Sequence, residues 1–156
     1  MLDRLVEAGN EPVLTDAADA PAAKVFPELA ATPWRKLRKA VDRLGGHPRD
    51  EELHHVRILA KRARYAAEAA ARAVPPAAKH GAALADLQTV LGDQHDAVVA
   101  EQWLREAVSA GTSRNQAFVA GLLVAAERAD AAQHRQSWRS AWKAASRPKV
   151  AGWLRT

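Results

Sequence analysis

Residues 53–74 read LHHVRILAKRARYAAEAAARAV, and this stretch decides the fold. At about 100° per residue, its leucine, valine and alanine side chains recur on one stripe, as in a helix that packs one face against a core. That stripe consists of Leu53, Val56, Ala60, Ala63, Ala67, Ala70 and Val74. The sequence therefore predicts a long amphipathic helix over 51–74, capped by Asp50 and ended by Pro75 and Pro76.

The rest of the chain favours helices as well. Alanine supplies 37 of the 156 residues, and it loses no side-chain entropy in a helix. Glycines separate further predicted helices, which cover 34–44, 76–91, 93–109 and 113–146. No stretch alternates as a strand does, so we expect an all-α antiparallel helical bundle. Its core should be anchored by tryptophans, namely Trp138 and Trp142 together with Trp34 and Trp103.

Residues 1–32 are expected to lie outside the bundle. Residues 2–9 resemble the end of a helix, and prolines 12, 21, 27 and 33 make 11–33 mainly extended. Thr32 and Pro33 suit the start of a helix. The predicted division is therefore an N-terminal helix end with a Pro-rich connection over 1–32, and the bundle over 33–156.

Charge and composition restrict the function. The formal net charge is +5, which favours an anionic partner. With no cysteine, the chain has no disulfide, thiolate nucleophile or Cys-ligated zinc. The charged N-terminal sequence does not fit a signal peptide, and the longest apolar stretch, 117–126, is far shorter than the roughly 20 residues that span a bilayer. We expect a soluble, cytoplasmic protein without membrane contact.

Basic residues form a second stripe beside the apolar one. Residues 53–79 carry six Lys or Arg and one acidic residue. Like charges one helical turn apart repel each other, so an anion between them would explain the pattern better than solubility does. The stripe comprises His54, Arg57, Lys61, Arg64 and Arg72, and Arg35 and Arg38 occupy the matching flank of the preceding helix. Two such flanks would form a basic groove, whereas Lys36, Lys39, Arg43 and Arg62 point elsewhere. The alternative is an ordinary solvated face.

Three other functions have weaker support in the sequence. His54, His95 and a carboxylate could hold a metal, and His95-Asp96 is similar to the HD dyad of metal phosphohydrolases, but cations around His54 oppose a metal ion. No nucleophile elbow or Gly-rich phosphate loop is present, so we expect no catalytic residue and no cofactor. Only Tyr65 interleaves with the basic stripe, which disfavours single-stranded nucleic acid. Duplex DNA could be held through phosphate contacts, although no helix-turn-helix pair is evident.

Two stretches resemble the signatures of the CHAD family, the conserved histidine α-helical domain. The first falls on Leu53, His54, Arg57, Ile58, Lys61, Arg62, Arg64 and Tyr65. The second falls on Leu87, Gln88, Leu91, Gly92 and Asp96. The resemblance covers about 33–155.

This resemblance implies two related helical halves around a basic cavity that binds inorganic polyphosphate without catalysis. It implies a partnership with a triphosphate-processing CYTH domain, to which any catalysis would belong. The chain has one copy of the His-Arg motif where the family has two, so it resembles the C-terminal half alone. We therefore expect it to pair with a second copy or with the missing N-terminal half. The motif implies phosphate contacts by His54, Arg57, Lys61 and Arg64, and the further candidates are Arg35, Arg38, Arg62, Tyr65 and His95.

Overall fold

The computed structural model describes residues 6, 9–10, 16–109 and 111–154. A short 3-10 helix, η1 (Asp16–Asp19), precedes α2 (Ala22–Asp42), α3 (Asp50–Ala70), α4 (Pro76–Ala107), α5 (Arg114–Ala145) and α6 (Pro148–Ala151). No strand occurs in the described ranges, so the predicted all-α bundle is confirmed. Within the same ranges, no helix is long and apolar enough to cross a membrane.

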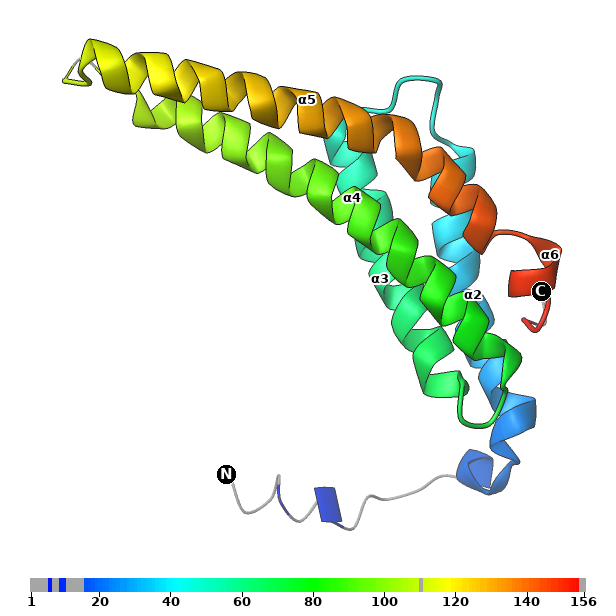
Figure 1. The fold of residues 1–156 in the computed structure, drawn as a ribbon. Coiled ribbons are helices and arrows are strands. Elements are labelled where there is room, and N and C mark those ends of the chain that lie inside the picture. Colours follow the sequence, from blue (N-terminus) through cyan, green and yellow to red (C-terminus); the bar gives the residue numbers. More distant parts are fainter. Residues whose placement is uncertain (1–5, 7–8, 11–15, 110, 155–156) are drawn as a thin grey trace.

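The helices pack in chain order. α3 packs against α2 on one side and α4 on the other, and α5 packs along α4 (Figure 1). α6 returns to α4 and α5. The paired α4 and α5 continue beyond the start of α3 as a projection with two helices (Figure 1). We call the paired residues 98–109 and 111–128 the α4–α5 arm.

The core lies where α2, α3, α4 and α5 meet. Leucines from three helices are fully buried, among them Leu37, Leu53 and Leu84. Trp34 of α2 lies with its ring centroid 5.2 Å from that of Trp142 on α5. The predicted anchoring by Trp34, Trp138 and Trp142 is confirmed. For Trp103 the prediction is wrong, because this residue lies on the arm and is 66% exposed.

The N-terminal half of α2 was predicted as an extended connection, and this prediction is wrong. α2 begins at Ala22 and continues through both Pro27 and Pro33. Its buried residues recur at helical spacing, from Pro27 through Ala30 and Ala31 to Trp34, Leu37 and Val41. Burial of this face outweighs the local cost of a proline inside a helix. The predicted start of the bundle at residue 33 therefore falls inside α2, and the helix predicted over 2–9 lies largely outside the described residues.

Two further helix limits differ from the prediction. α4 does not break at Gly92 but is one helix from Pro76 to Ala107. Gly92 is buried and lies next to the Arg57 side chain of α3. Asp50 is the first residue of α3, and Arg49 occupies the N-cap position. α5 agrees with the predicted helix over 113–146, and Ser113 Oγ caps it by accepting a hydrogen bond from the Gln116 backbone N–H at 3.3 Å.

Candidate functional site

The basic stripe of α3 lies along its contact with α4, where two glycines of α4 face side chains of α3. A Cβ atom at Gly92 would lie 3.5 Å from Arg57 Nε. Arg57 therefore extends over the position where α4 has no side chain. A Cβ atom at Gly81, three turns earlier, would lie 3.4 Å from Glu68 Cγ. Gly81 and Gly92 thus both face the polar flank of α3, at distances that an ordinary side-chain contact would have.

Two histidines meet across the same contact. The ring centroids of His54 on α3 and His95 on α4 are 4.2 Å apart, with the ring planes at 39°. Partial burial lowers the pKa of His95, and the positive charges of His54 and Arg57 lower it further, while Asp96 and Asp50 oppose the shift. The sequence predicted both histidines as candidates, and the structure brings them together.

The stripe continues with Lys61, Arg64 and Tyr65. Arg64 Nε lies 3.4 Å from Glu68 Oε1, an ion pair within α3. Two cations lie over the Tyr65 ring: the Arg64 guanidinium carbon is 5.0 Å from the ring centroid, and Lys61 Nζ is 5.8 Å from it. Tyr65 therefore acts as a neighbour that orients the two cations. We call His54, Arg57, Lys61, Arg64 and His95 the α3–α4 basic face.

Several polar atoms in this region lack a partner. His54 Nδ1, Arg57 Nε and Gln88 Oε1 are buried and accept or donate no hydrogen bond among the described residues. Neither Arg57 nor Lys61 forms an ion pair with any carboxylate that the structure describes. Buried polar groups are normally satisfied, so a cluster of unsatisfied ones needs an explanation. Gln88 was not predicted as a site residue, although it belongs to the second signature stretch.

The cations of α2 that face α3 are not the ones that the sequence predicted. A cavity of about 290 Å³ between α2 and α3 is lined by Lys36, Lys39, Arg43 and His55, together with Ala40 and Leu59. We call it the α2–α3 basic groove. Its α2 cations are those that the sequence assigned to ordinary surface.

Arg35 and Arg38 occupy the other flank of α2, about 100° and 40° around the helix from the buried Trp34. Both are exposed, and Arg35 donates a hydrogen bond to Thr32 Oγ1 at 3.3 Å. The structure therefore does not bring them to the α3–α4 basic face. Arg62 is exposed on the outer surface of α3, between this face and the α2–α3 basic groove.

The CHAD domain family matches residues 1–105, about two thirds of the chain. The chain belongs to the CHAD family. The matched residues contain α2, α3 and nearly all of α4, including both signature stretches and both histidines of the basic face. They also include residues before 33, where the resemblance in the sequence was expected to begin.

Curated relatives of this CHAD domain are uncharacterized proteins of Mycobacterium tuberculosis. One is from strain CDC 1551 / Oshkosh and the other from strain ATCC 25618 / H37Rv, and each is 36% identical over 129 residues. The alignment covers 77% of this chain and 24% of each relative, so the chain spans about a quarter of their length. No solved structure matches the chain significantly.

The carboxylates nearest the two histidines of the CHAD domain are already engaged or exposed. Asp50 Oδ1 accepts a hydrogen bond from Gln94 Nε2 at 2.6 Å, and Arg135 of α5 forms an ion pair with the same oxygen. Asp96 is exposed. Over the described ranges, no group of three or more His, Cys, Asp and Glu side chains is arranged to hold a metal ion. The geometry here is that of a cationic face with paired imidazoles.

Proposed function

We propose that the α3–α4 basic face binds inorganic polyphosphate without catalysing a reaction on it. The observation that carries the proposal is the position of Arg57. Its guanidinium lies over Gly92 beside the His54–His95 pair, and it has no carboxylate partner among the described residues. A cation held in this way lowers its energy by binding an anion. Phosphate oxygens suit both the guanidinium and the imidazoles as acceptors.

The length of the face supports a polymeric anion. His54 and Arg64 are ten residues apart on α3, which corresponds to about 15 Å along the helix axis. A single phosphate group could contact only part of that row. A chain of phosphates could contact Arg57, Lys61 and Arg64 in succession, with the lysine acting as a point charge and the arginines as two-pronged donors.

The α2–α3 basic groove adds to this proposal. It lies on the other side of α3, and the exposed Arg62 stands between the two basic regions. Cations therefore lie on both flanks of α3, with Arg62 between them. A long polyphosphate could cross this surface, whereas a short one would occupy the α3–α4 basic face, where the unsatisfied polar atoms lie.

Paired charge variants test the location. We expect Arg57→Ala with Lys61→Ala to weaken polyphosphate binding by at least about tenfold at low ionic strength, measured by titration calorimetry, because two direct phosphate contacts are lost. The control, Arg114→Ala with Lys143→Ala, removes the same charge from exposed positions on α5 and should change affinity less than about threefold. Equal losses in the two variants would mean that net charge alone attracts the polymer, and would contradict the proposal.

A comparison of ligands separates polyphosphate from nucleic acid. We expect polyphosphate to bind more tightly than duplex DNA, RNA or ATP, and its affinity to fall steeply with salt as counterions are released. DNA that bound equally well or better would favour the nucleic-acid alternative.

The metal-dependent phosphohydrolase alternative draws on the 4.2 Å approach of His54 and His95. Phosphate released from polyphosphate with an added divalent metal, and lost in His95→Ala, would support that alternative over simple binding.

Other expectations stay predictions that accompany this proposal. They are the cytoplasmic location, a triphosphate-processing CYTH domain as partner, and the assignment of this chain to the C-terminal half of a two-part fold.

A further inference from the structure

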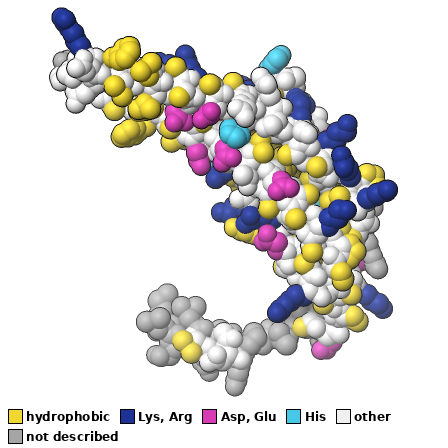
Figure 2. Space-filling model, in the orientation of Figure 1, with side chains coloured by type: hydrophobic (Ala, Val, Ile, Leu, Met, Phe, Trp, Pro, Cys, Tyr) yellow, Lys and Arg dark blue, Asp and Glu magenta, His cyan; other side chains and the backbone are white. Residues whose placement is uncertain are grey.

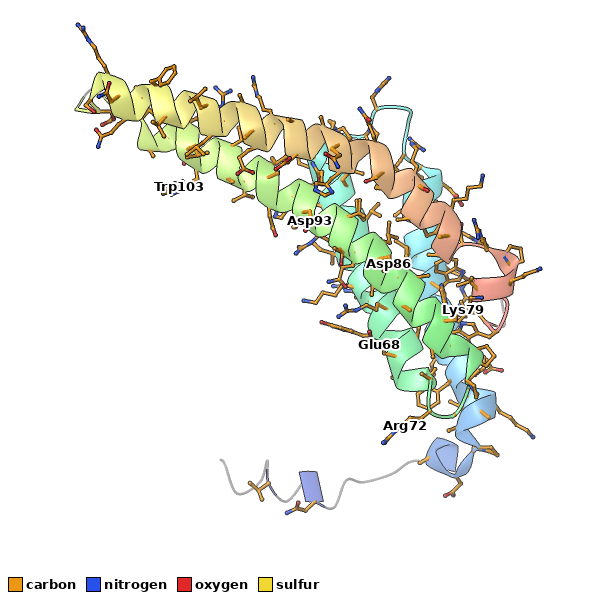
Figure 3. All side chains as sticks on the ribbon, viewed as in Figure 1. Glu68, Arg72, Lys79, Asp86, Asp93 and Trp103 are labelled. Carbon is orange, nitrogen blue, oxygen red and sulfur yellow. The ribbon has the colours of Figure 1, made fainter. Side chains whose placement is uncertain are left out.

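The α4–α5 arm exposes an unusual number of large apolar side chains. Trp103 on α4 is 66% exposed, and Phe118 and Leu122 on α5 are 68% and 56% exposed. Figure 2 shows hydrophobic side chains gathered over this arm, and Figure 3 shows Trp103 projecting from it, beyond Asp93. A contiguous apolar surface of this kind on a small domain marks an interaction site.

The apolar side chains of the arm are exposed because α4 has no α3 beside it there. α3 begins at Asp50, which is hydrogen-bonded to Gln94 of α4, so the part of α4 that follows extends past the end of α3. Val99 lies seven residues after the buried Gly92 and so occupies the same face of α4. Unlike Gly92, it is half exposed. The face that α3 covers over the body of α4 thus continues, uncovered, onto the arm.

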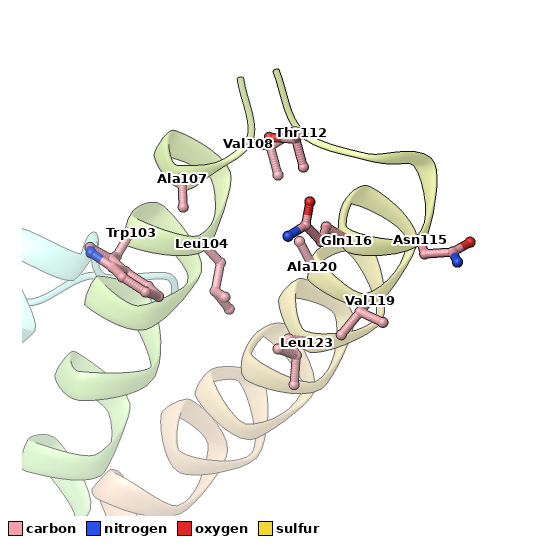
Figure 4. Close-up of a pocket in the computed structure, with 10 residues that line it drawn as sticks. All are labelled: Trp103, Leu104, Ala107, Val108, Thr112, Asn115, Gln116, Val119, Ala120 and Leu123. Atoms are coloured by element: carbon pink, nitrogen blue, oxygen red, sulfur yellow. The ribbon is translucent and has the colours of Figure 1, made fainter. Parts of the chain in front are cut away.

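A groove runs between the two helices of the arm. It is an open pocket of about 490 Å³ whose apolar wall includes Trp103, Leu104, Val119 and Leu123 (Figure 4). The groove and the exposed Phe118 and Leu122 give α5 a broad apolar face. Such a face suits another pair of amphipathic helices.

The arm carries no net charge, and this favours a second copy of the chain as its partner. Residues 98–128 contain three acidic residues and three arginines, whereas the whole chain has a net charge of +5. Glu101 binds Arg105 and Arg128 at 2.9 and 2.7 Å, and the hydrogen bond from Arg105 is the main reason that the pKa of Glu101 is lowered. A polyanion gains little on this neutral surface. Two copies of the chain, which repel each other elsewhere, can approach here without opposing charge.

The size of the apolar surface suits a dimer. From their exposed fractions and the usual areas of such side chains, the large apolar residues of the arm offer on the order of 600 Å². A standard interface takes about 800 Å² from each partner, and polar neighbours supply the remainder. These residues are Val99, Trp103, Val108, Phe118, Val119, Leu122 and Leu123.

We propose that the α4–α5 arms of two copies of this chain pack against each other as a two-fold symmetric four-helix bundle. The same apolar face would then be used by both copies, as a closed dimer requires. The pairing rests on the arm alone and does not depend on polyphosphate binding at the α3–α4 basic face.

Sedimentation equilibrium without polyphosphate tests the pairing. We expect the wild-type chain to dimerise reversibly, and Phe118→Glu with Leu122→Glu to weaken association by at least about tenfold, because charges would be buried at the interface. The control is Leu29→Glu, a substitution on α2 at a leucine that is 62% exposed, and it should leave association unchanged. Circular dichroism would confirm that all three chains keep their helix content.

Cross-linking gives a second measurement. The chain has no cysteine, so Leu122→Cys and Leu29→Cys each introduce a single thiol. Under mild oxidation, Leu122→Cys should form a disulfide-linked dimer faster than Leu29→Cys. A wild-type chain that stays monomeric, or a dimer that tolerates both arm glutamates, would overturn the proposal. A monomer that is bound only by another segment of a longer protein would assign the arm to that segment and would also overturn it.

Discussion

His80 is a histidine that burial keeps neutral. It is almost fully inaccessible, and its Nδ1 accepts a hydrogen bond from Trp153 Nε1 at 3.2 Å. Its ring meets Trp34 edge-on at 4.7 Å between centroids, and its Nε2 has no partner among the described residues. Burial lowers the pKa of His80 from 6.5 to about 4. Nothing local in the sequence indicates this burial, because the contacting Trp153, just after α6, comes from a distant part of the chain.

This burial predicts a pH-dependent stability. The pKa of His80 is lower in the folded chain than in the unfolded chain, so protons bind preferentially to the unfolded state. The stability that the neutral His80 gives to the folded chain is fully present above pH 6.5 and is lost as the pH falls toward 4. At pH 5 the free energy of unfolding should be lower by about 2 kcal/mol. Urea unfolding at pH 7.5 and pH 5 measures it, with His80→Phe as the comparison. A wild type and a His80→Phe variant with the same pH dependence would contradict this origin.

Gly92 lies inside α4, and its replacement by alanine should stabilise the chain. A Cβ atom there would meet Arg57 Nε at 3.5 Å, an ordinary contact, and the backbone is helical. Gly92→Ala should therefore raise the free energy of unfolding by about 0.5–1 kcal/mol, because glycine is unfavourable inside a helix. Thermal or urea unfolding measures the change. A loss of stability would show that the Arg57 guanidinium needs more room than the structure indicates.

At the scale of the helix, the strongest predictions came from regular apolar spacing. The α3 stripe was recognised because seven apolar positions follow the helical period, and six of them are buried. Val74 is not, since α3 ends at Ala70. Helix limits predicted at a proline or glycine were wrong where tertiary packing stabilises a continuous helix. Pro27 and Pro33 lie inside α2, and Gly92 lies inside α4, because in each case a continuous buried face spans the breaker.

The prolines of α2 allow a direct check of this account. Pro33 is only partly buried, and inside a helix a proline removes a hydrogen bond and crowds the preceding turn. Pro33→Ala should stabilise the chain by about 1 kcal/mol or more, measured by chemical unfolding. An unchanged or lower stability would mean that the proline ring makes a packing contact that outweighs its effect on the backbone.

The basic residues of α2 show what a single helix cannot reveal. The sequence separated Arg35 and Arg38 on one flank from Lys36, Lys39 and Arg43 on the other. The prediction turned the Arg35 and Arg38 flank toward α3, whereas in the structure the other flank adjoins it. That orientation depends on Trp34, which packs on His80 and Trp142 from two other helices. Long-range contacts of this kind fix the rotation of a helix about its axis.

Across the whole molecule, charge and apolar surface are separated. Cations gather along α3 and the adjoining flank of α2 in the body of the domain, while the α4–α5 arm is neutral and apolar. The helix content and the α3 stripe could be predicted from the sequence. The arm could not, because its exposure results from α3 starting far along α4, and no local pattern encodes the position at which one helix stops covering another.

Histidine titration by NMR, with and without polyphosphate, tests the proposed binding face most directly. In the free chain, burial and neighbouring positive charge lower the pKa of His95. A bound polyanion beside Arg57 would stabilise the imidazolium, so the pKa of His95 should rise by about half a unit or more, and affinity should increase as the pH falls from 7.5 to 6. His55 in the α2–α3 basic groove and the buried His80 provide internal comparisons. A pKa of His95 that stays unchanged at saturating polyphosphate, while that of His55 rises, would place the polymer in the other groove and contradict the account.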